Sequence, residues 1–188
     1  MVLLTRVWSL PGNNVFLVNE ERSRRVPKDA CQRQFLELLD LHGATLMAML
    51  RRLCGNCHDT EDVFQETAVR IWRSFSTRPR LRNPQAWVMT IGYRAFLNAR
   101  DRRPRHEVLS DPMDDRHGSP GQMAERSEER DRVQAAIAGL PEPIREVVVL
   151  HYVGGLTLGQ TAAAMELSPG TVKSRLNAAL NKLRSVLE

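Results

Sequence analysis

Apolar residues recur at steps of three and four through two blocks of this chain, and a stretch that cannot fold by itself separates them. That stretch, residues 111–127, holds two Pro, two Gly, no aromatic residue and an excess of acids, so it cannot bury enough apolar area. We therefore predict two small domains, at 29–106 and 128–188, joined by a flexible acidic linker at 107–127. Residues 1–28 lack clear periodicity and are expected to be a mobile extension or the product of an over-long gene start.

The first block predicts three helices. The first helix carries its apolar stripe from Phe35 to Leu53 and ends at Gly55. A second helix is expected to begin with Asp59 as its cap. The third is expected to turn four residues inward, namely Trp87, Ile91, Ala95 and Phe96.

The second block also has a purely helical pattern. One apolar stripe reaches Leu140, is interrupted by Pro141 and resumes from Ile144 to Tyr152. Two further helices begin at recognisable caps. Thr157 has Gln160 three residues later, as in a capping box, and Ser168 precedes Pro169. The last helix is expected to bury five residues, Val172, Leu176, Leu180, Leu183 and Leu187. Since strand-like alternation is absent from the sequence, we predict an all-α fold.

Charge is distributed unevenly along the chain. Residues 67–106 carry ten Arg against one Asp, a net charge of +9, whereas residues 31–66 carry three Arg against six acids, a net −3. Dense Arg clusters are typical of proteins that bind a polyanion, usually a nucleic acid. A solvated Arg-rich surface is the alternative explanation.

The last two helices have the pattern of a helix-turn-helix. The second of them exposes polar and basic residues in its N-terminal half, at Thr171, Lys173, Ser174 and Arg175, where they can reach base edges and phosphates in a major groove. An ordinary helical hairpin is the alternative.

Several classes of protein are excluded or disfavoured. The longest apolar runs, such as 46–50, are far shorter than the ~20 residues that span a bilayer, so membrane insertion is not expected. Without an export signal, three Cys indicate a reducing, cytoplasmic location. The five His are scattered and no Gly-rich phosphate loop follows a strand. We therefore predict no enzyme activity and no cofactor.

Two motifs carry a family resemblance. Residues 155–176, with Gly-Thr-Val-Lys-Ser-Arg at 170–175, resemble region 4 of a bacterial RNA polymerase sigma factor. Asp59-Thr-Glu-Asp-Val-Phe-Gln-Glu-Thr67, followed by Trp72 and by Pro84-Gln-Ala-Trp87, resembles region 2. The order and the linker resemble the small extracytoplasmic-function (ECF) group, which has only these two regions.

The resemblance implies a function and its residues. A sigma factor binds core RNA polymerase, recognises the −10 and −35 promoter elements and assists DNA melting. Its region 2 would dock on the β′ clamp helices through Asp62, Gln65 and Glu66, and the β subunit is a second expected contact. Family members are often held inactive by an anti-sigma factor, which adds that class to the expected partners.

The same resemblance places promoter DNA, both duplex and melted, on two groups of residues. For the −10 element the expected residues are Arg78, Arg80, Arg82, Asn83, Tyr93, Arg94 and Asn98. For the −35 element they are Ser168, Thr171, Lys173, Ser174 and Arg175. Trp72 and Trp87 fall on apolar stripes and are expected in the core.

The sequence departs from the family pattern at a few positions. Arg94 stands where Asn is usual and Asn98 where Asp is usual. Glu166 replaces a common turn Gly, and Gly159 with Thr161 replaces Glu and Ile. The −10 specificity is therefore left unassigned.

Two other functions stay open at the level of sequence. A helix-turn-helix regulator that never binds polymerase would share the DNA-binding residues. A redox or electron-transfer protein would use Cys54 and Cys57, because Cys54-Gly-Asn-Cys-His58 matches a haem-attachment motif and could also supply three zinc ligands. We expect a turn without metal at this pentapeptide.

Overall fold

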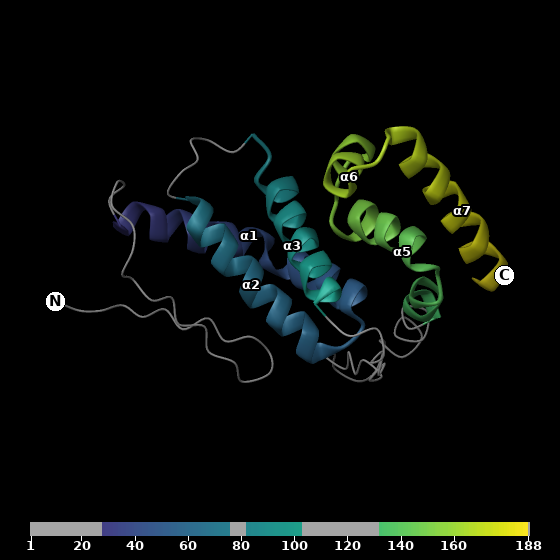
Figure 1. Ribbon diagram of the computed structural model, residues 1–188, viewed down its shortest axis with the longest axis horizontal. Coiled ribbons are helices and arrows are strands. Elements are labelled where there is room, and N and C mark those ends of the chain that lie inside the picture. Colours follow the sequence, from purple (N-terminus) through teal and green to yellow (C-terminus); the bar gives the residue numbers. More distant parts are fainter. Residues whose placement is uncertain (1–27, 76–81, 103–131, 188) are drawn as a thin grey trace, which may run out of the picture.

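The computed structural model describes residues 28–75, 82–102 and 132–187, and all regular secondary structure in these ranges is helical, as predicted. The N-terminal bundle consists of α1 (Lys28–Cys54), α2 (Cys57–Phe75) and α3 (Pro84–Asp101). The C-terminal helices are a segment at 132–138, α5 (Glu142–Val148), the π-helix η1 (Val149–Val153), α6 (Leu158–Met165) and α7 (Pro169–Leu187) (Figure 1). The predicted linker and almost all of the predicted extension lie outside the described residues.

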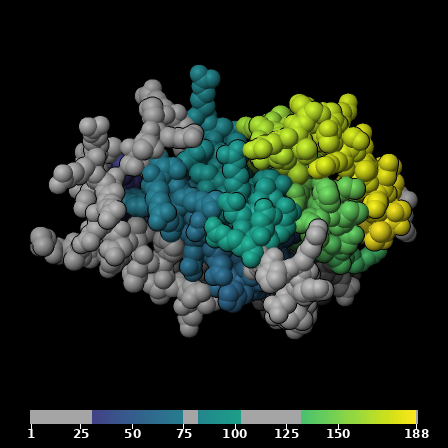
Figure 2. Space-filling view, viewed as in Figure 1, coloured from purple at the N-terminus to yellow at the C-terminus, as the bar shows by residue number. Residues whose placement is uncertain are grey.

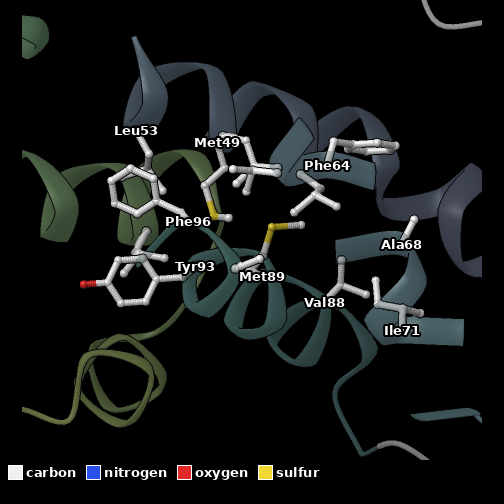
Figure 3. Close-up of a cluster of buried hydrophobic side chains, with 14 of the residues drawn as sticks. Met49, Leu53, Phe64, Ala68, Ile71, Val88, Met89, Tyr93 and Phe96 are labelled. Carbon is white, nitrogen blue, oxygen red and sulfur yellow. The ribbon is translucent and has the colours of Figure 1, made fainter. Parts of the chain in front are cut away.

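The N-terminal bundle is built around side chains that its three helices bury against one another. Leu46 and Met49 of α1, Ile71 of α2 and Met89 of α3 are fully buried in this core. Figure 3 labels the last three of them. At Gly92 the α1 and α3 helices approach so closely that an added Cβ would lie 2.5 Å from a Leu46 methyl carbon. Any larger residue at this crossing would therefore force the Leu46 side chain to move.

The turn between α1 and α2 differs in detail from the prediction. Asp59 was expected to cap α2, but α2 begins at Cys57 and Asp59 lies in its first turn. Asn56 takes the capping role, since its Oδ1 accepts a hydrogen bond from the Asp59 backbone N–H at 2.8 Å. Gly55, at φ +78°, makes the left-handed step that ends α1.

The buried face of α3 also differs from the prediction. Trp87 and Ile91 are only half-buried, whereas Val88, Met89, Gly92 and Tyr93 are buried together with the expected Ala95 and Phe96. The physical reason is that α3 has two neighbours. It packs on α1 and α2 along one side and on the C-terminal helices along another, so its buried surface is wider than one apolar stripe.

A π-helix shifts the register of the C-terminal stripe. Pro141 ends the preceding segment, α5 begins at Glu142, and η1 then closes with the Gly154 N–H donating to Val149 O at 2.9 Å. The wider turn brings Val149 and Leu150 inward and leaves Tyr152 58% exposed. The prediction that Tyr152 continues the buried stripe was therefore wrong, because that prediction assumed a regular α-helix.

The helix-turn-helix forms with the predicted caps. Thr157 and Gln160 make the reciprocal capping box of α6, and Ser168 Oγ accepts the Thr171 N–H at 3.1 Å at the start of α7. Glu166 adopts the left-handed conformation at the turn, with φ 56° and ψ 39°. On α7, Ala179 is buried in place of the expected Leu180, which is exposed.

The larger hydrophobic core extends across both predicted domains. Val149, Leu150 and Leu156 of the C-terminal helices belong to the core cluster of the N-terminal bundle. A Cβ on Gly154 would lie 3.4 Å from Met49 Sδ, so the backbone of one part touches the side chains of the other. Figure 2 shows the green and yellow atoms of the C-terminal helices directly against the teal atoms of α3. The described parts of the chain thus form one packed body.

Candidate nucleic-acid interface

One face of α3 presents polar and basic groups to solvent. Arg94, Asn98 and Arg102 are exposed and follow one another at four-residue steps, which places them on the same side of the helix. Two of these three are predicted −10 residues. A row of this kind can follow a phosphate backbone and leave an amide free for a base edge.

The start of α3 holds two more predicted −10 residues. Arg82 is exposed, whereas Asn83 is the N-cap, its Oδ1 accepting the Ala86 N–H at 3.0 Å. The Asn83 side chain therefore caps the start of α3. Arg78 and Arg80 lie outside the described residues.

Tyr93 is turned away from solvent. Only 3% of it is exposed, and its hydroxyl points out of the N-terminal core toward the C-terminal helices (Figure 3), where it donates to Glu146 Oε2 at 2.6 Å. Burial, followed by the hydrogen bond and charge of Glu146, raises the pKa of Tyr93 well above its ordinary value. In this arrangement Tyr93 cannot stack on an unpaired base.

Arg100 completes a charged network around Glu146. One guanidinium nitrogen, Nη1, donates to Glu142 Oε1 at 2.7 Å and to Glu146 Oε1 at 2.8 Å. Burial alone would lower the pKa of Arg100, but the bond to Glu142 and the neighbouring carboxylate charges raise it. Glu146 is 6% exposed and remains tolerable as a buried charge because both its oxygens are bonded. Sequence reasoning missed this network, although a lone Glu within the apolar run after Ile144 was a signal.

Two further polar contacts join α3 to the C-terminal helices. Arg94 Nη2 lies 3.7 Å from Glu166 Oε1, and Gln85 Nε2 donates to Gly154 O at 2.9 Å. Together with the Glu146 network, these contacts place C-terminal groups along much of the length of α3.

The exposed half of α7 carries the predicted −35 residues. Lys173 and Ser174 are exposed, while Val172 and Leu176 are buried and fix the orientation of the helix. Ser168 and Thr171 have bonded hydroxyls, Oγ to Oγ1 at 2.9 Å. Arg175 is half-buried and reaches back to Pro143 O at 3.5 Å, a weak contact that a phosphate could replace.

The predicted polymerase-binding residues share one side of α2. Asp62 pairs with His58, Nδ1 to Oδ2 at 3.3 Å, and Glu66 pairs with Arg70, Oε1 to Nε at 2.8 Å. Gln65 is half-exposed between them. Because exposed ion pairs of this type are weak, all three polar side chains are available to a docking partner.

The cysteine pentapeptide forms the turn between α1 and α2. Cys54 is half-buried, Cys57 is exposed, and His58 faces Asp62. Cys31 of α1 is half-buried. Within 28–75, 82–102 and 132–187, no three His, Cys, Asp or Glu side chains are grouped so that they could hold a metal ion. Of the helices in these ranges, none combines the length and apolarity needed to cross a bilayer.

Comparison with protein families identifies both halves. The model for sigma-70 region 2 matches residues 38–106, and the model for sigma-70 region 4 matches residues 130–183. The ECF RNA polymerase sigma factor SigL of Mycobacterium tuberculosis is 31% identical over 156 residues, 80% of this chain and 87% of the relative. The chain belongs to the ECF RNA polymerase sigma factors. Both helical parts are therefore sigma regions, and a helix-turn-helix regulator without region 2 is not favoured.

Other relatives agree with this assignment. The ECF sigma factor SigE of Mycolicibacterium smegmatis is 33% identical over 157 residues, which cover 80% of this chain and 60% of that relative. Among solved structures, CnrH in complex with the cytosolic domain of CnrY has a TM-score of 0.60 and 27% identity, covering 83% of this chain and 88% of CnrH. RpoE with NepR from Bartonella quintana shares the fold, with a TM-score of 0.64 and 24% identity over 86% of this chain and 98% of RpoE.

Proposed function

We propose that this ECF sigma factor binds core RNA polymerase through α2 and directs it to promoters that α3 and α7 recognise. The observation that supports this most is that one chain matches both sigma regions and presents a separate polar face for each task. The Asp62, Gln65 and Glu66 face is acidic and suits a protein partner. The exposed faces of α3 and α7 are basic and suit DNA.

Melting needs no catalytic group in this proposal. Arg side chains bind the phosphates of the opened strand. Aromatic faces stack unpaired bases at about 1 to 3 kcal/mol each, which for Tyr93 requires that its hydroxyl first leaves Glu146. This is comparable to the stacking lost per base-pair step, about 1.4 kcal/mol. Binding energy can therefore hold a bubble open without hydrolysis. The proposed site of action is the cytoplasm, where the polymerase works.

An anti-sigma factor is the proposed inhibitory partner. Two of the similar solved structures are complexes: CnrH with the cytosolic domain of CnrY, and RpoE with the anti-sigma factor NepR. A regulator of this kind would cover the same polar faces of α2, α3 and α7.

The experiment that tests the proposal is transcription in vitro with purified core bacterial RNA polymerase and a library of promoter fragments. Three proteins are compared: wild type, an Asp62→Ala/Gln65→Ala/Glu66→Ala variant, and Glu37→Ala as a control on an exposed position of α1. We expect transcripts from defined start sites with wild type and the control, and few with the triple variant. Folded protein that binds DNA but never directs polymerase would contradict the proposal.

A further inference from the structure

Two cysteines flank the turn that joins α1 to α2, and the proposed function uses neither of them. Cys54 is the last residue of α1 and is half-buried against the core of the N-terminal bundle. Cys57 is the first residue of α2 and is exposed. A Cys-x-x-Cys pair in which one thiol is accessible and the other can attack it is the arrangement of a reversible protein disulfide.

Within one chain, Cys54 and Cys57 can pair only with each other. Cys31 and Cys54 lie near opposite ends of α1, and at a rise of about 1.5 Å per residue they are about 35 Å apart. A disulfide needs Cα atoms within about 7 Å of each other. Cys57 follows Cys54 by three residues, a span of at most about 11 Å even in an extended chain. The span is shorter here, because α2 turns back along α1 at Gly55, which has φ +78° (Figure 1).

The turn has room to bring the two sulfur atoms together. Gly55 is exposed, and a Cβ added to it would meet no atom within 4 Å. The Cys57 side chain lies in solvent and can rotate without displacing packed groups. Because the Cys54 thiol packs on the core and a disulfide has a narrow range of geometries, joining the two sulfur atoms requires the turn backbone to shift.

Asn56 lies between the two cysteines and holds the first turn of α2. Its Oδ1 accepts the Asp59 N–H at 2.8 Å. Its backbone oxygen accepts the Thr60 hydroxyl at 2.6 Å and the Thr60 N–H at 3.3 Å. Asp59 and Thr60 are buried, so these bonds satisfy groups that water reaches poorly. A disulfide between Cys54 and Cys57 closes a ring that includes Asn56, and the shift of the backbone weakens this cap.

The same shift reaches the face of α2 that is proposed to dock on polymerase. His58 follows Cys57 directly and pairs with Asp62, Nδ1 to Oδ2 at 3.3 Å. Asp62 is one of the three predicted polymerase-binding residues. A change in the first turn of α2 therefore moves the partner of a docking residue.

We propose that Cys54 and Cys57 form a thiol site that low-molecular-weight disulfides oxidise, and that the resulting protein disulfide weakens the docking of α2 on polymerase. The second part of this inference rests on the proposed function. The Cys57 thiolate attacks one sulfur of the small disulfide, which forms a mixed disulfide and releases one small thiol. The Cys54 thiolate then attacks the Cys57 sulfur and releases the second small thiol. Two cysteine thiols are oxidised, the small disulfide is reduced to two thiols, and the cysteine protons pass to the departing thiolates.

The first test follows the disulfide in the full chain, in mixtures of reduced and oxidised glutathione. Trypsin cleaves after Arg52 and Arg70, so both cysteines lie in one peptide, 53–70. After the remaining thiols are alkylated, mass spectrometry should show this peptide losing both alkyl groups and two hydrogens as the oxidised share of glutathione rises. Cys31→Ser should show the same transition, and Cys57→Ser should form no internal disulfide. A peptide that stays fully alkylated, or that keeps glutathione on Cys57, would overturn the inference.

The second test measures the cap of α2 by amide hydrogen exchange with nuclear magnetic resonance. Exchange at the Asp59 and Thr60 N–H groups requires their bonds to Asn56 to open. We expect oxidation to speed exchange at both amides about fivefold, the effect of losing a helix cap. In reduced protein, Asn56→Ala should also speed exchange, whereas Asn56→Ser keeps a capping oxygen and should not. Equal exchange in reduced and oxidised protein would show that the disulfide leaves the cap intact.

The third test measures affinity for core RNA polymerase. The protein is oxidised or reduced beforehand and the glutathione is removed, so that the cysteines of the polymerase never meet it. We expect the oxidised form to bind about fivefold more weakly than the reduced form. Cys57→Ser, treated in the same two ways, should bind as reduced wild type does in both cases. Because Cys57 is exposed, this control keeps the core intact even if Cys54→Ser does not fold.

The outcomes separate the thiol site from the proposed function. Equal affinity of oxidised and reduced wild type for polymerase would overturn the effect on docking. If the disulfide forms and the cap loosens, but reduced wild type does not bind polymerase, the thiol site stands and the proposed function is the part that is wrong.

Discussion

Glu146 shows most clearly how a single residue links stability to function in this chain. A carboxylate that is 6% exposed would destabilise the protein if it were unpaired, but Tyr93 and Arg100 satisfy both of its oxygens. Those partners belong to α3, so the burial of Glu146 depends on the two parts staying together. The same interaction withdraws the Tyr93 ring from solvent and pairs the Arg100 guanidinium, which stays exposed.

The ionisation of Tyr93 reports on this contact. Burial and the adjacent Glu146 raise its pKa, so the contact is complete below the ordinary tyrosine pKa of about 10. The contact between Tyr93 and Glu146 is lost as the pH rises through the raised pKa of Tyr93. In a Tyr152→Phe background, where Tyr93 is the only tyrosine, Glu146→Gln should lower the pKa because a negative charge is removed. Ultraviolet absorbance of the tyrosinate measures it.

A Glu37→Gln variant in the same background is the control and should titrate as the parent does. Identical titration curves for Glu146→Gln and the parent would mean that the hydroxyl and the carboxylate do not interact in solution.

Thr161 presents the opposite case, a buried polar atom without a partner. It is fully buried in α6, and its Oγ1 has no hydrogen-bond partner among the described residues. Thr161→Val keeps the shape and removes the orphan hydroxyl, so the free energy of unfolding should rise by about 1 kcal/mol in chemical denaturation. Thr60→Val should have the opposite effect, because Thr60 Oγ1 donates to Asn56 O at 2.6 Å. A loss of stability in Thr161→Val would contradict this account.

Among whole elements, the helix starts that depend on residues close together in the sequence could be predicted. The capping box of α6 and the start of α7 depend on residues within four positions of each other, and both formed as expected. The buried face of α3 could not be predicted, because α3 also packs against residues more than forty positions later in the chain. The π-helix was missed because it changes helical register without a local sequence signal at Val149.

The capping box gives a prediction at this scale. Thr157→Ala removes the acceptor of the Gln160 N–H, a bond of 3.2 Å. The free energy of unfolding should fall by about 1 kcal/mol in chemical denaturation. Thr157→Ser retains the hydroxyl and should remain within a few tenths of a kcal/mol of wild type. If both variants lost the same free energy of unfolding, the loss would come from packing and not from capping.

For the whole molecule, the charge pattern predicted the kind of partner but not how the two helical parts pack against each other. The Arg-rich 67–106 segment predicts a polyanion as partner, and two of its arginines, Arg94 and Arg102, are exposed on α3. The sequence predicted two small helical domains joined by a linker, but it did not predict that Leu150 and Leu156 join the core of the N-terminal bundle. Contacts between distant segments depend on three-dimensional shape, which periodicity does not encode.

Salt should weaken DNA binding by the whole molecule. Each phosphate neutralised by an Arg or Lys releases counterions, so log affinity should fall linearly with log salt concentration. Lys173→Ala should reduce the slope for duplex promoter DNA by about 1 if Lys173 contacts one phosphate. Fluorescence anisotropy across a salt series measures both slopes. A wild-type affinity independent of salt would contradict the proposed interface.

The central claim, that one chain reads two separated promoter elements as part of polymerase, is tested most directly by footprinting. Core polymerase with this protein is bound to a promoter recovered from the transcription library, and protected bases are mapped by hydroxyl-radical cleavage. We predict two protected segments, near −35 and −10, with Arg175→Ala losing the upstream one and keeping the downstream one. A single protected segment, or equal loss of both segments in Arg175→Ala, would contradict the account.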